Sequence, residues 1–375
     1  MDRKSLNKIL TLSPWRELDR ITAGITPLER GFAPAIQVHV DHLTKPKGSL
    51  GRLESLAMQL ALINASAGRG PAPQVDPACI YTCAADHGVA ARGVSLFPQE
   101  VTRQMVLNFL NKGAAVNALT ACAGVDLVVV DAGVKGPGFQ DAPNLISRKI
   151  RQGSADMTQG PALTEAECRQ ALELGFSLAS RAAGKGVRTV GTGEMGIANT
   201  TAATALYCAY LGLDPEMITG PGTGLDQNGM RHKARVIRQA LSVNHKAVAS
   251  ADPMNILAAL GGLEIACLAG LILGSAFHKL AVVLDGFIST AAYVAAWKCR
   301  PVVQEYVFFA HGSAEPGHRI ILEHLNARPI LDLDMRLGEG TGAALAIPIL
   351  RAAAAMYNNM ASFSQAGIKD DGNSG

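Results

Sequence analysis

Short apolar runs alternate with longer amphipathic stretches along most of this chain. Five apolar runs end in polar loops that contain Gly, Asp, His or Ser, and they cover residues 78–83, 127–130, 187–190, 281–284 and 303–309. Four of them are short and apolar, as expected for strands buried on both faces of a sheet. Helical periodicity predicts helices at about 100–121, 164–183, 200–211, 228–243, 261–278 and 287–298. This alternation predicts an α/β fold with a doubly wound, mostly parallel, Rossmann-like sheet.

A polar loop follows each predicted strand. Because ligands bind outside the carboxyl ends of the strands in such sheets, we expect these loops to converge on one crevice. They cover residues 84–88, 131–133, 191–196, 285–286 and 310–315. Asp86 and His87 in the first loop are compatible with an acid–base pair, although a loop histidine satisfied by backbone groups is the simpler interpretation.

Glu339 is a candidate to join this crevice. It lies between Gly338 and Gly340, just before an apolar, Ala-rich segment that reads as a helix. Flanking glycines allow the backbone to approach a ligand closely, and the first N–H groups of a helix favour an anion. We therefore expect an acid and an anion site to share this loop. The alternative is an ordinary Glu at a helix start between flexible glycines, and these residues alone leave both interpretations open.

Composition and charge narrow the class of protein. The 375 residues are 48% hydrophobic and 17% charged, which fits one large α/β domain with an appended piece, or two domains. The net charge is only +3, and no block of Lys and Arg or interleaved aromatic stripe is present. Nucleic acid is therefore not an expected partner.

The cysteines and the ends of the chain indicate a cytoplasmic protein. The seven cysteines are scattered and lie mostly in apolar runs, as expected for buried thiols in a reducing compartment, and no metal site is expected. The charged N-terminus lacks an apolar signal segment. Residues 256–277 are long enough to span a bilayer, but they contain four glycines and lead into another strand. We interpret them as a buried helix and expect no membrane partner.

Three loops have the composition of phosphate-binding turns. Gly191-Thr-Gly-Glu-Met-Gly196 matches the dinucleotide fingerprint, which keeps an NAD-dependent dehydrogenase and a non-catalytic nucleotide-binding protein open as alternatives. Two features argue against a dinucleotide. Glu194 places a negative charge inside this loop, and Asp214 follows a predicted helix, whereas the fingerprint requires an acid at the end of a second strand. The segments 219–225 and 311–313 add turns of small residues, each also compatible with a plain turn. Together they predict a distributed phosphate site that lacks the lysine of a P-loop.

Several collinear motifs resemble one enzyme family. They are Ala85-Asp-His-Gly-Val89, Phe97-Pro-Gln-Glu-Val-Thr102, Gly191 to Thr201, Gly222-Thr-Gly224, Gly262-Leu-Glu-Ile265, Asp285-Gly-Phe287, His311-Gly-Ser-Ala-Glu315 and Arg336-Leu-Gly-Glu-Gly-Thr-Gly342. This set resembles the nicotinate-nucleotide:dimethylbenzimidazole phosphoribosyltransferases, in order from about Leu43 to Ala355. About 40 residues at the start and the tail after Met360 carry no matching motif.

The resemblance implies a reaction. Members of this family move 5-phosphoribose from nicotinate mononucleotide to 5,6-dimethylbenzimidazole, with inversion at C1′, in assembly of the cobalamin nucleotide loop. The products are α-ribazole 5′-phosphate and nicotinate. No cofactor is implied. A homodimer is implied, with a small helical domain formed by residues 1–50 together with 350–375 and a large α/β catalytic domain at 51–349.

The resemblance also assigns roles to residues. Glu339 is implied as the general base, and Glu194 as a second carboxylate near the ribose. The implied phosphate and ribose ligands are Met195, Gly196, Gly222, Thr223, Gly312, Ser313 and Gly338, with Lys233 as an added charge. Taken by itself, Lys233 reads as a solvated charge on a helix. The slot for the aromatic base is expected at Phe97, Gln99 and Met105, with Met195 beside them.

Overall fold

The core of the protein is a six-stranded sheet in which every neighbouring pair of strands is parallel. The computed structural model describes residues 22–140 and 142–368. The order of the strands is β3 (Leu145–Ser147), β2 (Asp126–Gly133), β1 (Ala78–Ala85), β4 (Thr189–Met195), β5 (Ala281–Leu284) and β6 (Val307–Phe309). The chain runs outward from β1 in one direction and then outward from β4 in the other. The predicted doubly wound α/β fold is confirmed.

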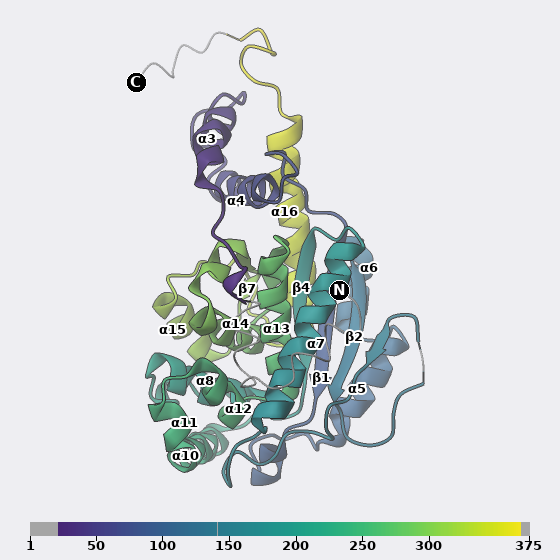
Figure 1. Ribbon diagram of the computed structural model, residues 1–375, viewed down its shortest axis with the longest axis vertical. Coiled ribbons are helices and arrows are strands. Elements are labelled where there is room, and N and C mark those ends of the chain that lie inside the picture. Colours follow the sequence, from purple (N-terminus) through teal and green to yellow (C-terminus); the bar gives the residue numbers. More distant parts are fainter. Residues whose placement is uncertain (1–21, 141, 369–375) are drawn as a thin grey trace.

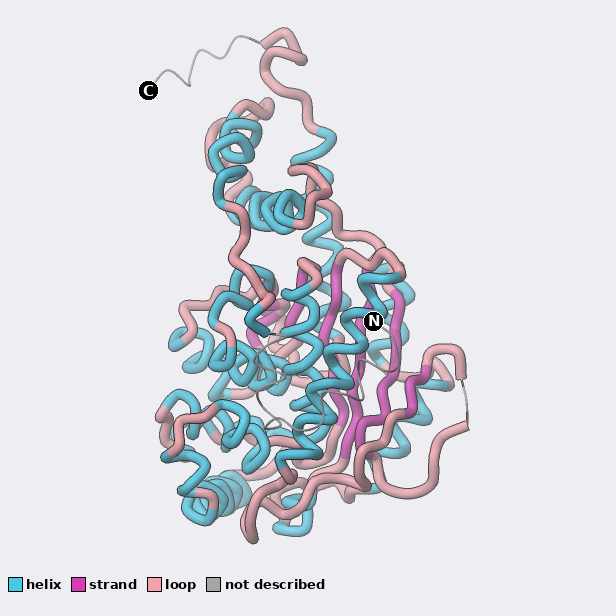
Figure 2. Tube along the Cα trace, viewed as in Figure 1, coloured by secondary structure: helices cyan, strands magenta, loops and turns pink. Residues whose placement is uncertain are grey.

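Helices enclose this sheet on both faces (Figures 1 and 2). Adjacent residues of β1 show the two faces, because Thr82 bonds to Glu339 beside α16 whereas Cys83 contacts Cys267 of α13. The helices are α5 (Glu100–Leu110), α6 (Ala115–Ala123), α7 (Glu165–Gly184), α8 (Asn199–Leu211), α9 (Pro215–Ile218), α10 (Gln227–Val243), α11 (His245–Ala249), α12 (Pro253–Leu260), α13 (Leu263–Phe277), α14 (Phe287–Cys299), α15 (Pro316–His324) and α16 (Thr341–Asn359). Short 3-10 helices lie at η1 (Arg30–Phe32), η2 (Gly88–Arg92) and η3 (Pro301–Tyr306).

Three predicted elements are divided or shortened in the structure. The single helix expected at 100–121 is divided into α5 and α6 by a turn in which Lys112 is left-handed. Of the strand expected at 303–309, only the last three residues form β6, because Pro301 starts η3. Gly261 and Gly262 divide the apolar stretch at 256–277 into α12 and α13, and no helix within the described residues is long and apolar enough to cross a membrane.

Helices near the start of the described chain lie beside its C-terminal segment. Helices α3 (Ala33–Asp41) and α4 (Arg52–Ser66) pack next to the C-terminal half of α16 and project from the body (Figure 1). Leu43 forms an isolated antiparallel bridge with Ser362, and His39 Nε2 lies 2.8 Å from the Tyr357 carbonyl oxygen. A small domain built from 1–50 and 350–375 stays a prediction, and residues 1–21 and 369–375 of it lie outside the described residues.

Candidate functional site

A cavity of about 260 Å³ opens at the carboxyl ends of β4 and β5. Residues from β4 and the start of α8, from the start of α14, from the β7 (His311–Gly312) segment and from the loop before α16 line it. The convergence expected for the loops at 191–196, 285–286 and 310–315 is therefore confirmed. The loops at 84–88 and 131–133 do not line this cavity, so Asp86 and His87 lie outside it.

The cavity brings together many of the expected site residues but leaves others outside. Those that line it are Phe97, Glu194, Met195, Gly196, Gly222, Thr223, Ser313 and Gly338. Those that do not line it are Gln99, Met105, Lys233, Gly312 and Glu339.

Glu194 is a buried carboxyl group in the wall of the cavity. Its Oε2 accepts a hydrogen bond from the Asn199 side chain. Burial, together with the nearby Asp285 carboxylate, raises the pKa of Glu194 to about 8, and the hydrogen bond from Asn199 opposes this shift. Near neutral pH Glu194 is therefore mainly protonated. A cation in the cavity would favour the ionised form.

The backbone around Glu339 adopts conformations that few side chains tolerate. Gly338, Glu339 and Gly340 have φ angles of 86°, 66° and 100°, and the left-handed form of a non-glycine residue costs on the order of 1 kcal/mol. The loop also approaches β4 closely, since a Cβ at Gly338 would lie 2.2 Å from Glu194 Oε1. The Glu339 N–H donates to the Glu194 carbonyl oxygen at 3.2 Å. The glycines on both sides of Glu339 therefore allow positive φ angles and a close approach to β4, and the expected close approach to a ligand stays a prediction.

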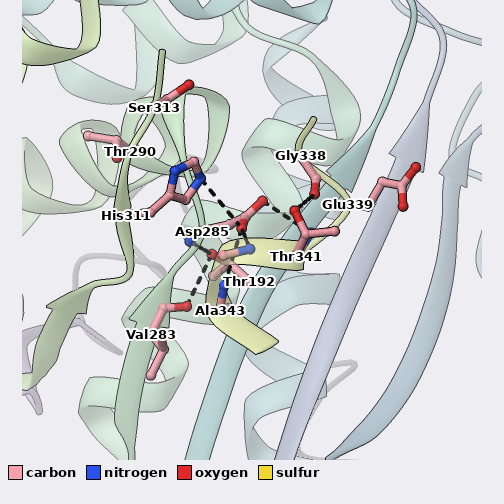
Figure 3. A network of polar contacts seen from close by, with 12 residues as sticks. Thr192, Val283, Asp285, Thr290, His311, Ser313, Gly338, Glu339, Thr341 and Ala343 are labelled. Atoms are coloured by element: carbon pink, nitrogen blue, oxygen red, sulfur yellow. Dashed lines mark hydrogen bonds and ion pairs between the residues drawn. The ribbon is translucent and has the colours of Figure 1, made fainter. Parts of the chain in front are cut away.

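The Glu339 side chain turns away from the cavity (Figure 3). Its Oε2 accepts a hydrogen bond from the Val116 N–H at 3.3 Å, in the first turn of α6, where the N-cap residue Ala114 offers no side-chain acceptor. Burial raises the pKa of Glu339; the bond from Val116 lowers it, and the Asp285 carboxylate raises it. The carboxylate is thus partly desolvated, as a general base for a weakly acidic N–H requires.

An apolar cluster adjoins this carboxylate. We call it the α5–α6 cluster, and it consists of Ala84, Val106, Phe109, Ala114, Val116, Val129, Val134 and Phe139. Met105 and Met195 pack against it. Since Met195 also lines the cavity, the cluster and the cavity are neighbours.

The N-terminus of α16 is occupied by a side chain of the protein itself. Asp285 Oδ2 accepts from the Gly340 N–H at 3.1 Å, and its Oδ1 accepts from the N–H groups of Gly342 at 2.6 Å and Ala343 at 3.2 Å (Figure 3). The expectation that this helix terminus would bind an anion next to Glu339 is wrong. Asp285 instead fixes the loop that carries Glu339, and no signal in the local sequence identified this role.

Lys233 is fully buried beneath the Gly222 turn. Its Nζ donates to Thr200 Oγ1 at 2.7 Å and to the Gly220 carbonyl oxygen at 3.3 Å. The interpretation of Lys233 as a solvated charge is wrong, because its face of α10 packs against the body of the protein. Burial lowers the pKa of Lys233 to about 8, and the nearby Glu315 carboxylate opposes this. Glu315, which sequence reasoning did not select, lines the cavity and accepts from the Gly222 N–H at 2.9 Å.

The backbone N–H of Ser313 already has a partner. It donates to His318 Nδ1 at 2.8 Å, while the ring Nε2 lies 3.1 Å from Thr290 Oγ1. Burial, with a further contribution from His311, lowers the pKa of His318 to about 3, so the ring is neutral and Nδ1 is free to accept. The side-chain hydroxyl of Ser313 therefore remains as the group that can donate to a ligand.

The amide of Gln99 is also committed within the protein. Its Nε2 donates to the His87 carbonyl oxygen at 2.6 Å, and its Oε1 accepts from Lys135 Nζ. Phe97, by contrast, is 53% exposed at the edge of the cavity and is free to contact a ligand.

The glycines of the dinucleotide fingerprint serve packing within the protein. Gly191 and Gly193 lie inside β4 and not in the turn that follows a strand. A Cβ at Gly191 would lie 2.5 Å from Ile80 Cγ1, and one at Gly193 would lie 2.3 Å from the Glu339 carbonyl oxygen. Because the protein itself fills the space above both glycines, they leave no room for a pyrophosphate there, and the dehydrogenase alternative is not supported.

Comparison with known proteins decides the family. A family model described as a phosphoribosyltransferase matches residues 25–368. A nicotinate-nucleotide–dimethylbenzimidazole phosphoribosyltransferase of Nitratidesulfovibrio vulgaris is 57% identical over 354 residues, which cover 94% of this chain and 98% of the relative. The chain belongs to this phosphoribosyltransferase family.

Other relatives agree with that assignment. A phosphoribosyltransferase of the same name from Pelodictyon phaeoclathratiforme is 52% identical over 94% of this chain and 97% of its own length. A crystal structure of the enzyme with this name from Thermus thermophilus superposes with a TM-score of 0.85 at 44% identity. The superposition covers 91% of this phosphoribosyltransferase and 99% of that chain.

Proposed function

We propose that this phosphoribosyltransferase moves 5-phosphoribose from nicotinate mononucleotide to 5,6-dimethylbenzimidazole. The products are nicotinate and α-ribazole 5′-phosphate, formed with inversion at C1′ in assembly of the cobalamin nucleotide loop. The observation that carries the proposal is the 57% identity to a relative named for these two substrates. Two buried carboxyl groups on adjoining backbone segments, Glu194 and Glu339, support it.

The departure of nicotinate requires little help from the enzyme. The pyridinium nitrogen of nicotinate mononucleotide is cationic, so nicotinate departs without being protonated. The incoming imidazole must lose its N–H proton while its other nitrogen attacks C1′. We assign Glu339 as the general base that accepts this proton, because burial raises the pKa of its carboxyl group. We assign to Glu194 the role of facing the positive charge that develops at the ribose, because its carboxyl group lines the cavity.

The residues that line or adjoin the cavity suggest where the phosphate and the aromatic base bind. We place the 5′-phosphate between the start of α8 and the Gly222 turn, with the Ser313 hydroxyl as a donor and Lys233 as a buried positive charge below. We place the aromatic base between Phe97, Met195 and Met105, next to the α5–α6 cluster. Gly312 and Gly338 shape the turns on either side, and Gln99 holds the segment that carries Phe97.

Changes in the phosphate region should weaken mononucleotide binding. Ser313→Ala removes the free hydroxyl donor, and we expect KM for nicotinate mononucleotide to rise by about tenfold with kcat less affected. Gly222→Val places a branched side chain at φ 55°, with its Cβ 3.0 Å from Thr200 Oγ1, and should raise KM further. Steady-state kinetics at saturating dimethylbenzimidazole measures both effects.

A matched control is Ser177→Ala, since Ser177 is an exposed serine of α7 outside the cavity. It should leave KM for both substrates unchanged. Altered selectivity for dimethylbenzimidazole with unchanged mononucleotide affinity in the Ser313 and Gly222 variants would show that these turns do not hold the phosphate.

The reaction itself is tested by proton NMR of the anomeric position after incubation with both substrates and EDTA. Nicotinate mononucleotide contains a phosphomonoester and a cationic leaving base, and no pyrophosphate leaves in the reaction. Mg²⁺ therefore has no leaving pyrophosphate to neutralise, and we expect activity to survive EDTA. One displacement from a β-nucleotide must give the α-anomer. A β-product, or full dependence on an added divalent metal, would defeat the proposed mechanism.

We propose a homodimer for this phosphoribosyltransferase, acting in the cytoplasm without a cofactor. The family resemblance supports the dimer, and the scattered cysteines support the location. A non-catalytic nucleotide-binding protein would have no need of Glu339, and the relatives carry the names of enzymes.

A further inference from the structure

A histidine and a glutamate form a buried ion pair behind the wall of the cavity. His87 Nε2 donates to Glu264 Oε1 at 2.6 Å, and the two side chains are 1% and 0% exposed. His87 follows β1, Glu264 lies in the first turn of α13, and neither residue lines the cavity. The acid that meets His87 is therefore Glu264 and not its neighbour Asp86, and the ring is bonded to a carboxylate and not to backbone groups.

The charge of Glu264 keeps His87 protonated to a higher pH than an exposed histidine. Burial lowers the pKa of His87, but the charge and the hydrogen bond of Glu264 raise it above its ordinary value, and Asp86 adds to this. Glu264 Oε2 has no hydrogen-bond partner among the described residues. The carboxylate therefore depends on the His87 ring, and loss of the ring would leave a buried charge without compensation.

The ring of His87 fits between two glycine backbones. A Cβ at Gly262 would lie 2.2 Å from His87 Cε1. A Cβ at Gly196 would lie 3.3 Å from His87 Cδ2 and 3.3 Å from Glu264 Oε1. Gly262 is the N-cap residue of α13, whereas Gly196 lines the cavity between β4 and α8. The ion pair therefore supports the back of a turn whose other side faces the cavity.

The main chain of His87 holds a second wall of the cavity. Its carbonyl oxygen accepts from Gln99 Nε2 at 2.6 Å. Gln99 is the N-cap residue of α5 and lies two residues after Phe97, which lines the cavity. One residue thus contacts both sides of the proposed site, because the ring packs against Gly196 on the phosphate side and the carbonyl oxygen holds Gln99 on the side of the aromatic base.

We propose that His87 is a positioning residue for phosphoribosyl transfer and that Glu264 holds its ring in place. This inference rests on the proposed function. His87 does not line the cavity, so it acts by fixing the Gly196 turn relative to the segment that carries Phe97. Transfer requires the attacking nitrogen of the base in line with C1′, and a displacement of about 1 Å between reactants lowers a rate by about a hundredfold.

The first test is His87→Leu, which removes the bond to Glu264 and keeps an apolar side chain of similar size. We expect kcat per binding-competent site to fall about 10- to 100-fold, with Kd for nicotinate mononucleotide raised by less than about fivefold. Calorimetric titration with nicotinate mononucleotide counts the competent sites. A merely structural role would lower the number of sites and leave kcat per site unchanged, and that result would overturn the proposal.

Conservative variants keep the test decisive if His87→Leu does not fold. His87→Gln places an N–H group near the position of Nε2, and Glu264→Gln keeps an acceptor for the ring. Each retains a hydrogen bond without the ion pair, and kcat per site should fall only about three- to tenfold. A value equal to that of the unmodified enzyme, or as low as that of His87→Leu, would overturn the proposal.

The matched control is a histidine at the other end of α13. His278 is the C-cap residue of this helix, and its Nε2 lies 2.8 Å from Ser180 Oγ. It does not line the cavity. His278→Leu and His278→Gln should leave the number of competent sites and kcat per site unchanged. Losses as large as those of the His87 variants would overturn a specific role of His87.

Crystal structures of the His87 variants separate this inference from the proposed function, because they require no transfer. We expect the Gly196 backbone to move relative to Gln99 by about 1 Å in His87→Leu and by less in His87→Gln. An unmoved Gly196 in both variants would overturn the positioning role even if transfer occurs. Absence of transfer by the unmodified protein, with a displaced Gly196 in the variants, would overturn only the proposed function.

Discussion

Replacement of Glu339 by Gln is expected to lower kcat by about two to four orders of magnitude, the range for losing a general base. Gln keeps the size of the side chain and an oxygen that can accept from the Val116 N–H, but it cannot take a proton. Because Glu339 does not line the cavity, KM for nicotinate mononucleotide should stay within a few-fold. Release of nicotinate under saturating dimethylbenzimidazole measures kcat.

The pH profile gives a second measurement for this variant. A base must be ionised to act, so kcat of the unmodified enzyme should fall as the pH falls through the pKa of Glu339, which burial raises. Glu339→Gln should lose this dependence along with the activity. Glu323→Gln, at an exposed position of α15, is the matched control and should retain full activity. Near-normal turnover of Glu339→Gln would remove Glu339 from the mechanism.

Asp285→Ala is expected to lower both stability and activity more than the loss of an ordinary helix cap. Three buried N–H groups, of Gly340, Gly342 and Ala343, lose their acceptor. Each unsatisfied buried donor costs about 1–3 kcal/mol, so we expect the free energy of unfolding to fall by about 4 kcal/mol. The Gly340 backbone adjoins Glu339, and kcat should therefore fall by at least about a hundredfold.

The control for this prediction is another capping aspartate. Asp252 accepts from the N–H groups of Met254 and Asn255 at the start of α12, but it is partly exposed, so water can replace it. Asp252→Ala should cost about 1 kcal/mol and leave kcat unchanged. Urea denaturation followed by circular dichroism compares the two variants. Equal losses of stability would mean that Asp285 is an ordinary cap.

The sequence by itself determined the class of fold and the place of the site. Strands buried on both faces are mostly apolar, and this pattern located β1, β5, the middle of β2 and the first two residues of β4. The glycines around Glu339 also marked the loop before α16 as a candidate part of the site, although its positive φ angles were found only in the structure. Both signals arise within a few residues, where covalent geometry and burial act directly on the local sequence.

Local patterns were less informative where an element is short or interrupted. The strand β3 has three half-buried residues and no apolar run, so no periodicity indicated it. The division of the helix at 100–121 depended on Lys112 taking a left-handed conformation, which its residue type does not favour. The packing of α5 and α6 on the sheet outweighed the continuous helical pattern there.

Only the tertiary structure decided which polar groups meet. Asp285 caps α16 from 57 residues away, and Glu339 reaches the Val116 N–H over 223 residues. Lys233 is buried because its face of α10 lies against the Gly222 turn, and His311 lies at the start of α14 because β5 and β6 are neighbours in the sheet. Hydrogen bonds and desolvation depend on distances that the order of the strands sets, and a pattern within one segment contains no information on that order.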